Sequence, residues 1–235
     1  MRGLLVTGTD TGVGKTVVTA GLARILADRG ENIGVMKPVE TGCPEEGWPA
    51  DAGFLARAGR VDDSMDLVVP CRFREPLAPL VAARREGGVV DVEAIRAAFG
   101  KLTVKYDRLL VEGAGGLSVP LTDDVDTAEL AALLGLKVLV VARPGLGTLN
   151  HTCLTVHYAR SHVLQVIGVV ISGFNPRTED VAERTNPEVI ESRCAVPMLG
   201  LVPKAMDVDT PEGAARAVDR GVHLDRLLSA WEEEN

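Results

Sequence analysis

The first apolar run of the chain, over residues 3–7, leads directly into a glycine-rich loop that precedes a helical pattern. The loop reads GTDTGVGKT over residues 8–16, and its last two residues are Lys15 and Thr16. Glycines allow backbone N–H groups to converge on phosphate oxygens, and the start of a helix adds the positive end of its dipole. A strand, a loop of this composition and a helix in this order predict an α/β fold of the P-loop NTPase type.

The loop departs from the strict spacing Gly-x-x-x-x-Gly-Lys-Thr, which requires glycine at position 9, where this chain has Thr9. The alternative is a glycine-rich turn that merely connects a strand to a helix, and the Lys15-Thr16 ending argues against it. In the phosphate-binding interpretation, Lys15 reaches the β and γ phosphates and the Thr16 hydroxyl ligates magnesium. We therefore predict a nucleotide-binding segment made of Gly12, Val13, Gly14, Lys15, Thr16 and Val17.

Short apolar runs recur between longer amphipathic stretches along the rest of the chain. Runs that are apolar on both faces are typical of strands in a buried parallel sheet, and they lie at 3–7, 32–38, 108–112, 137–142, 166–172 and 198–202. Helical patterns lie at 14–29, 51–59, 91–102, 127–134, 149–162, 178–193 and 211–231. This alternation predicts a doubly wound, mostly parallel sheet of about seven strands flanked by helices. The segments 41–49 and 70–80, which are rich in turn-forming residues, are predicted to be loops.

Length and composition limit the class of protein. A chain of 235 residues that is 46% hydrophobic is long enough for one large domain, which we place at 1–235. The 25 basic and 33 acidic residues give a net charge of -8, so the surface repels nucleic acid and anionic membranes, and any phosphate site is local. We find no pattern of a signal peptide or a membrane span, and we expect a cytoplasmic protein whose ligands are small molecules.

The four cysteines, Cys43, Cys71, Cys153 and Cys194, are scattered along the sequence. They form no Cys-x-x-Cys pair, and no clustered histidines accompany them as in a typical zinc site. We therefore interpret them as free thiols in a reducing cytosol.

Charged residues follow two of the predicted strands. In doubly wound sheets ligands bind beyond the carboxyl ends of the strands, and Lys37 lies at such an end, near the phosphate loop. A second cation there neutralises charge on a transferred phosphoryl group or on a carboxylate-like acceptor. A lone lysine at a strand end is more often a solvated surface charge, but the neighbouring phosphate loop favours a functional role here.

Three oxygen-bearing residues form a candidate metal site. Asp51 opens a predicted helix, where its simplest role is that of an N-cap or first-turn carboxylate. Glu112 ends an apolar strand and precedes the sequence GAGG over 113–116, whose backbone can approach a ligand closely. Because magnesium prefers oxygen ligands, Thr16, Asp51 and Glu112 are a predicted magnesium set that phosphate oxygens and water complete.

Four motifs, taken together, resemble the dethiobiotin synthetase family in order, spacing and position at strand ends. They are GTDTGVGKT at 8–16, KPVETG at 37–42, VEGAGG at 111–116 and GTLNH at 147–151, and the resemblance extends to about residue 203. Cobyrinate-type amidotransferases share the phosphate loop but need a glutamine-hydrolysing domain, for which this chain has no length. Partition-type ATPases carry an extra lysine early in the loop, where this chain has Asp10. A partition-type switch ATPase and the ATP-binding half of an amidotransferase are the alternatives.

The resemblance implies a C–N bond-forming cyclo-ligase of biotin biosynthesis. Such an enzyme uses ATP and Mg2+ to join 7,8-diaminononanoate with CO2, through a carbamate and a carbamic-phosphoric anhydride, and yields dethiobiotin, ADP and phosphate. Phosphoryl transfer of this kind depends on positioning, metal and cations rather than on a protein nucleophile.

The same resemblance implies roles for individual residues. Lys37 and Lys15 are the catalytic cations. The nucleotide-binding set extends beyond the phosphate loop to Asp51, Glu112, Gly113, Ala114, Gly115, Ser172, Gly173 and Pro203. The residues that approach the diamine are Thr11, Lys37, Thr41, Gly115 and Asn150. The family is homodimeric, so the 145–150 loop is expected to act at the partner's site; His151 beside it is interpreted as an ordinary helix histidine without a catalytic role.

One position departs from the family. After the strand that ends at Ile171, the family commonly has an asparagine that reads the adenine edge, whereas this chain has Ser172-Gly173. Asn175 lies three residues further on and is an alternative reader of the base. A serine hydroxyl offers less hydrogen-bonding reach than an amide, so the base preference of this chain is left open.

Overall fold

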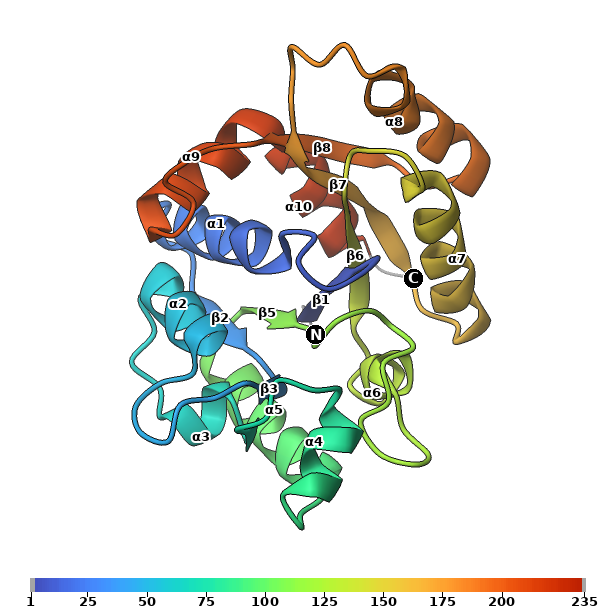
Figure 1. The fold of residues 1–235 in the computed structure, drawn as a ribbon. Helices are drawn as coiled ribbons and strands as arrows, with labels where there is room; N and C mark the ends of the chain where they lie inside the picture. The colour runs from blue at the N-terminus through green and yellow to red at the C-terminus, as the bar shows by residue number, and fades with distance from the viewer. Residues whose placement is uncertain (1–2, 234–235) are drawn as a thin grey trace.

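The computed structural model describes residues 3–233, and a parallel sheet forms its centre (Figure 1). The six strands of this sheet follow the order β2-β5-β1-β6-β7-β8, and every neighbouring pair is parallel. Their bounds are β1 (Gly3–Gly8), β2 (Ile33–Met36), β5 (Arg108–Glu112), β6 (Lys137–Ala142), β7 (Val166–Phe174) and β8 (Met198–Pro203). The predicted doubly wound parallel fold is confirmed, with six strands in the main sheet of the described residues instead of about seven.

A second, two-stranded parallel sheet pairs β3 (Val39–Thr41) with β4 (Cys71–Phe73). The predicted loop at 70–80 is wrong where the segment forms β4 and the first two residues of α4 (Pro79–Arg85). Strands of three residues are too short to show a period, and the neighbouring prolines indicate turns. In Figure 1, α4 lies at the end of the molecule opposite α8, and β3 lies between α4 and the main sheet.

Helices cover both faces of the main sheet. The predicted helices are confirmed as α1 (Lys15–Asp28), α2 (Ala50–Gly59), α5 (Val92–Lys105), α6 (Thr127–Leu133), α7 (Thr148–Ser161) and α8 (Val181–Cys194). The helix predicted at 211–231 is instead two helices, α9 (Pro211–Gly221) and α10 (Leu224–Glu232), because Val222 between them is extended and pairs with Gly200 of β8. A short helix, α3 (Met65–Val68), was not predicted. Within residues 3–233, every helix is too short or too polar to cross a membrane.

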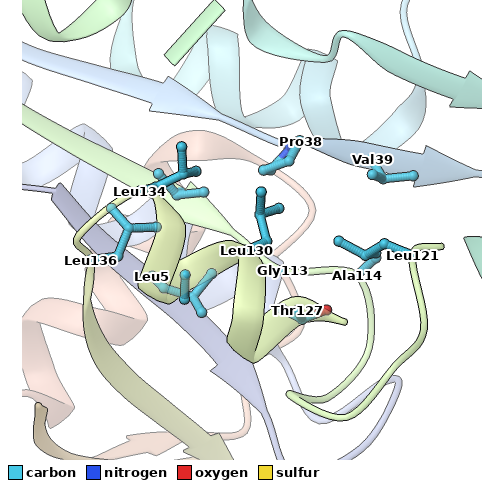
Figure 2. A pocket seen from close by; sticks show the side chains of 12 residues that line it. Leu5, Pro38, Val39, Gly113, Ala114, Leu121, Thr127, Leu130, Leu134 and Leu136 are labelled. Atoms are coloured by element: carbon cyan, nitrogen blue, oxygen red, sulfur yellow. The ribbon is translucent and has the colours of Figure 1, made fainter. Parts of the chain in front are cut away.

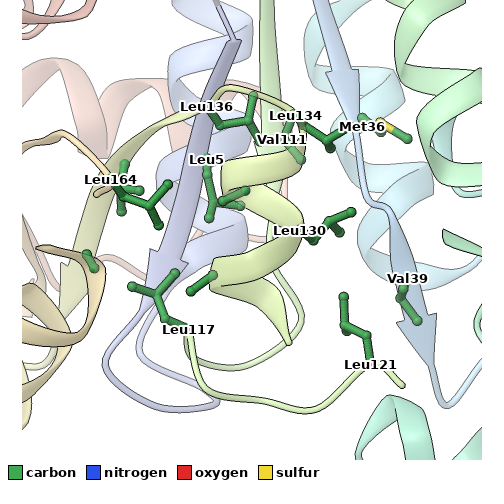
Figure 3. Close-up of a cluster of buried hydrophobic side chains, with 14 of the residues drawn as sticks. Leu5, Met36, Val39, Val111, Leu117, Leu121, Leu130, Leu134, Leu136 and Leu164 are labelled. Carbon is green, nitrogen blue, oxygen red and sulfur yellow. The ribbon is translucent and has the colours of Figure 1, made fainter. Parts of the chain in front are cut away.

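The core consists of two apolar layers on opposite faces of the sheet. Successive side chains of a strand point to opposite faces, so Leu5 of β1 joins one layer and Leu4 joins the other. The Leu5 layer packs against α5, α6, α7 and α8 and includes Leu130 of α6 (Figure 3). The Leu4 layer packs against α1, α2, α9 and α10. Burial on both faces explains why the strand segments are continuous apolar runs in the sequence.

A disulfide joins α7 to α8. It links Cys153 and Cys194, whose Cα atoms lie 5.5 Å apart although 41 residues separate them in the sequence. The expectation of four free thiols is therefore wrong for this pair, whereas Cys43 and Cys71 are free and buried. Spacing gave no signal of the bond, because the packing of two helices brings the thiols together.

Candidate active site

The phosphate loop connects β1 to α1 at the carboxyl edge of the main sheet. Gly12 and Gly14 have φ angles of 73° and 98°, a left-handed conformation that glycine adopts without strain. A Cβ at Gly14 would also lie 2.3 Å from Ser172 Oγ, so only glycine fits between the loop and β7. Gly14 caps α1 without a side-chain hydrogen bond, and the N–H groups of the first turn remain available for an anion.

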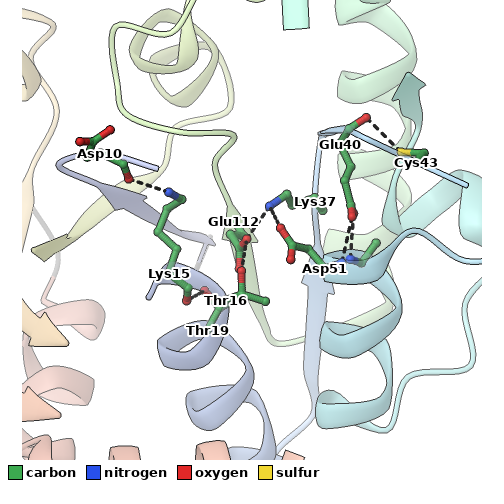
Figure 4. A network of polar contacts seen from close by, with 10 residues as sticks. Asp10, Lys15, Thr16, Thr19, Lys37, Glu40, Cys43, Asp51 and Glu112 are labelled. Atoms are coloured by element: carbon green, nitrogen blue, oxygen red, sulfur yellow. Dashed lines mark hydrogen bonds and ion pairs between the residues drawn. The ribbon is translucent and has the colours of Figure 1, made fainter. Parts of the chain in front are cut away.

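Lys15 folds back over this loop. Its Nζ donates a 3.0 Å hydrogen bond to the backbone oxygen of Asp10, and the residue is only 7% exposed (Figure 4). Burial lowers the pKa of Lys15, and the negative charge of Glu112 opposes that shift. The loop therefore encloses the partly desolvated ammonium group of Lys15. This group forms stronger, charge-assisted hydrogen bonds when phosphate oxygens replace the backbone oxygen of Asp10 as its partner.

Lys37 lies between two carboxylates just beyond β2. Its Nζ donates to Asp51 Oδ2 at 2.7 Å and to Glu112 Oε1 at 2.5 Å, and Thr16 Oγ1 donates to the same Glu112 oxygen at 3.0 Å (Figure 4). Lys37 is 4% exposed and Glu112 is fully buried. Burial lowers the pKa of Lys37, but Glu112 and Asp51 outweigh it and leave the pKa above its ordinary value. Lys37 is thus a fixed positive charge at neutral pH.

The predicted magnesium set is brought together around this lysine. Thr16 and Glu112 are in direct contact, and Asp51, in the first turn of α2, is linked to them through Lys37. Glu112 Oε2 is buried and has no hydrogen-bond partner among residues 3–233, so it is a free acceptor that suits a cation. Among residues 3–233 no group of three or more His, Cys, Asp or Glu side chains could hold a metal. A magnesium ion here would therefore need the Thr16 hydroxyl and phosphate oxygens in addition to the carboxylates of Asp51 and Glu112, as its preference for oxygen ligands allows.

Glu40 supports this network and was missed in the sequence. Its two carboxylate oxygens accept hydrogen bonds from the backbone N–H groups of Asp51 and Ala52, each at 2.9 Å, and so cap α2 from β3. Burial raises the pKa of Glu40. Cap patterns in a sequence join residues three positions apart, whereas Glu40 precedes Asp51 by eleven. Its place in the KPVETG motif was the only available signal.

The glycine loop after β5 packs against the phosphate loop. Gly115 has a φ of 73°, and a Cβ there would lie 3.7 Å from Thr11 Oγ1; a Cβ at Gly116 would lie 3.2 Å from the Gly8 oxygen. The structure therefore brings together Thr11 and Gly115, two of the residues predicted to approach the diamine, and Gly113 and Ala114 belong to the same loop. Thr41 ends β3 and is half-buried.

Asn150 is placed differently from the other predicted substrate residues. It is exposed in the first turn of α7 and lines a groove of about 330 Å³ with Cys153, Arg160 and Cys194. None of the other predicted substrate residues lines this groove. In the described chain Asn150 thus lines a groove that Lys37, Thr11, Thr41 and Gly115 do not line.

The predicted base-side residues lie at the ends of β7 and β8. Ser172 is buried beside Gly14 and pairs in register with Val202, and Pro203 pairs with Phe174. Asn175 is exposed, its Oδ1 accepts from the N–H of Arg177 at 3.1 Å, and its own N–H donates to Glu183. The side-chain oxygen of Asn175 is thus engaged in a local turn, whereas Ser172 lies directly against the loop.

Cavities of very different size lie near this edge of the described chain. The first, beneath Gly113 and Ala114, is apolar and measures about 10 Å³, so it holds at most a single water molecule (Figure 2). The second measures about 430 Å³ and lies between the phosphate loop and α7, with Thr9, Ser118, Thr155 and Tyr158 in its wall. Only the second is large enough for a small-molecule substrate, and it adjoins the start of the phosphate loop.

The chain is similar to known proteins along most of its length. A family model described as an AAA domain matches residues 2–212. The ATP-dependent dethiobiotin synthetase BioD of Bacillus subtilis (strain 168) is 42% identical over 97% of this chain and 98% of its own length. The protein of the same name from Aquifex aeolicus (strain VF5) is 46% identical over 89% of this chain and 92% of its own.

Solved structures with low sequence identity share the fold. The cell division protein MinD of Aquifex aeolicus has a TM-score of 0.61 at 16% identity and covers 100% of this chain and 99% of its own. A ParA family ATPase from Chlorobium tepidum TLS has a TM-score of 0.56 at 13% identity, over 98% and 96% of the two chains. These likenesses concern the fold alone, whereas the sequence relatives match over nearly the full length. The chain belongs to the ATP-dependent dethiobiotin synthetase family.

Proposed function

We propose that the carboxyl edge of the main sheet uses the γ-phosphoryl group of ATP to activate a carbamate and close a cyclic urea. The substrates are 7,8-diaminononanoate, CO2 and ATP, and the products are dethiobiotin, ADP and phosphate. The observation that carries this proposal is the buried Lys37, held between Asp51 and Glu112 beside the phosphate loop. Such a fixed cation suits a site where negative charge gathers on a carbamate and a phosphoryl group.

The reaction has three bond-forming steps. One neutral amine of the diamine attacks CO2, forms a C–N bond and loses a proton to solvent, which gives a carbamate. A carbamate oxygen attacks the γ-phosphorus, and the bond to ADP breaks as the new O–P bond forms. The second amine then attacks the carbamate carbon, the C–O bond to phosphate breaks, and a second proton leaves. Positioning and charge neutralisation are the contributions that a protein makes to such steps.

The described side chains divide these tasks. The backbone N–H groups of the phosphate loop and Lys15 hold the β and γ phosphates, because the loop encloses that ammonium group. Lys37 lies beyond β2, where its charge stabilises the carbamate and the transferred phosphoryl group together. Thr11 and Gly115, which the structure brings together, and Thr41 at the end of β3 approach the diamine.

Thr16, Asp51 and Glu112 hold Mg2+ in this proposal. The unpartnered Glu112 Oε2 and the contact between Thr16 and Glu112 support this assignment. When bound, the metal neutralises phosphate charge. Gly113, Ala114, Ser172, Gly173 and Pro203 complete the nucleotide site.

We further propose that the enzyme is a cytoplasmic homodimer of single-domain subunits. Asn150 is exposed and lines a groove that the other proposed substrate residues do not line, which supports a role at the partner's site. The net charge of -8 argues against nucleic acid and anionic membranes as partners.

A phosphate-release assay tests this function. With magnesium, bicarbonate and ATP, we expect release to depend on added diaminononanoate, because the carbamate is the phosphoryl acceptor. The alternatives, a partition-type switch ATPase and the ATP-binding half of a cobyrinate-type amidotransferase, predict slow turnover that the diamine does not change. Release at one rate with and without the diamine would reject the proposal.

A further inference from the structure

A buried asparagine of α8 holds the segment that leads into α7. Asn186 is 3% exposed, and its Nδ2 donates to the backbone oxygens of Pro144 at 2.7 Å and Gly145 at 3.2 Å. Both hydrogens of the side-chain amide are therefore used on two consecutive carbonyls more than 40 positions earlier in the chain.

The position of Asn186 is one where packing alone favours an apolar side chain. The buried residues of α8 are Asn186, Ile190 and Cys194, which share one face at intervals of four. An amide on such a face is costly unless its hydrogen bonds are made, whereas leucine or isoleucine buries apolar surface at no such cost. The backbone oxygens of Pro144 and Gly145 satisfy the hydrogen-bond donors of this amide.

The carbonyl of Gly145 also sets the start of α7. This oxygen accepts a hydrogen bond from the N–H of Thr148 at 3.3 Å as well as one from the side-chain amide of Asn186. Gly147, which directly precedes Thr148, is the N-cap of the helix and has a φ of 94°. Thr148 is fully buried, so the first turn of α7 is fixed at both its backbone and a side chain. Asn150 projects from that same turn.

The far end of α8 is anchored to α7 independently. Cys194 is bonded to Cys153, and Arg160 of α7 donates to the backbone oxygens of Cys194 and Ala195, each at 2.7 Å. Because this anchor fixes α8 against α7, the amide of Asn186 has a defined place from which to hold the 144–145 carbonyls.

We infer that Asn186 is a positioning residue for the substrate: it fixes the 144–150 segment and so presents Asn150 to the diamine. This inference rests on the proposed function, because it takes Asn150 as a substrate residue. In the described chain the Asn186 side chain has no hydrogen bond to the phosphate loop or to Lys37. Its removal therefore weakens the binding of the diamine and leaves the binding of ATP unchanged.

The test compares Asn186→Ala and Asn186→Asp with Ile190→Ala. The aspartate keeps the size of asparagine but has no donors when ionised, and Ile190→Ala loosens the same helix face without touching the 144–145 carbonyls. We expect KM for diaminononanoate to rise about tenfold in both Asn186 variants, while KM for ATP stays within about twofold. Burial beside two carbonyl oxygens raises the pKa of the introduced carboxyl above its ordinary value, so lowering the pH protonates it and restores one donor, and the KM ratio of Asn186→Asp to wild type should then fall.

Amide hydrogen exchange over 145–151 gives a readout that does not depend on activity. Asn186→Ala should speed amide exchange over 145–151. Ile190→Ala should leave exchange of this segment unchanged, even where it lowers the melting temperature by as much as Asn186→Ala does. An unchanged KM for the diamine in Asn186→Ala, an equal rise in Ile190→Ala, or unchanged exchange would overturn the inference. If wild-type turnover ignores the diamine, the proposed function fails instead, and the exchange comparison still decides whether Asn186 positions the segment.

Discussion

The phosphate side and the α7 side of the same sheet edge are built in different ways. On the phosphate side, Lys15, Lys37 and Glu112 are buried, Lys37 and Glu112 form a short ion pair, and glycines in left-handed conformations shape the loop. On the α7 side, Asn150 is exposed, and the segment before it is held from a distance by Asn186. The phosphate side therefore has charged groups in fixed positions, whereas the α7 side has a backbone segment that hydrogen bonds hold in place.

This difference follows from what each side does in the proposed reaction. Fixed charges lower the free energy of a transition state without reorganising, so they are most effective when buried and paired. A side that admits a flexible diamine has to stay open, and its geometry then depends on how the backbone is held. We therefore expect changes on the phosphate side to lower kcat and changes on the α7 side to raise KM.

The largest effect is expected for Lys15→Ala. The variant loses the ammonium group that faces the β and γ phosphates, and kcat should fall about 10³-fold or more. The melting temperature should change little, because glycines and not Lys15 give the loop its shape. Phosphate release with the diamine measures the rate. Near-normal turnover would show that the loop does not hold the phosphates.

Lys37→Gln should lower kcat about 10²-fold while the Kd of ATP stays within about threefold. The reason is that the partner of Lys37 is charge that develops on the carbamate and the γ-phosphoryl group, not charge already present in bound ATP. Lys101→Gln, at an exposed position of α5, is the matched control and should be neutral. A change confined to the Kd of ATP would assign Lys37 to nucleotide binding.

Base selectivity tests the nucleotide end of the phosphate side. Ser172 offers fewer directed hydrogen bonds than an asparagine, and the side-chain oxygen of Asn175 is engaged with Arg177. We expect CTP, GTP or UTP to support the reaction within about tenfold of ATP, a difference of ~1.4 kcal/mol in transition-state binding. Specificity constants for the four nucleotides measure this. An ATP preference of several hundredfold would mean that backbone groups or Asn175 read adenine.

The smallest effect is expected for Glu40→Ala. This change removes the two hydrogen bonds that cap α2, and the free energy of unfolding should fall by about 1–2 kcal/mol. Because Asp51 is then less well fixed beside Lys37, kcat should fall a few-fold. Glu46→Ala, at an exposed position between β3 and α2, is the control and should change neither quantity. If urea denaturation gave the same free energy of unfolding for both variants, the hydrogen bonds of Glu40 to α2 would not stabilise the fold.

The sequence predicted the phosphate side far better than the α7 side, for a physical reason. Lys15 and Thr16 belong to a contiguous motif, and Lys37 and Glu112 end apolar strands, so parallel strand order alone brings them to one edge. The hydrogen bonds of Asn186 and the Cys153–Cys194 bond depend on how two helices pack, which periodicity does not specify. The same limit hid β3, β4 and the cap by Glu40, because those pairings join short segments far apart in the sequence.

In the proposed reaction a carbamate oxygen attacks the γ-phosphorus at this edge of the sheet. Bicarbonate labelled with ¹⁸O tests it directly, because the attacking oxygen stays with the phosphate when the urea ring closes. Early in the time course we predict that one of the four oxygens of each released phosphate comes from CO2 and has the same ¹⁸O enrichment as the dissolved CO2. We also predict that this labelling requires the diamine. Phosphate released with the diamine but without label would contradict the account, since water and not a carbamate would then be the acceptor.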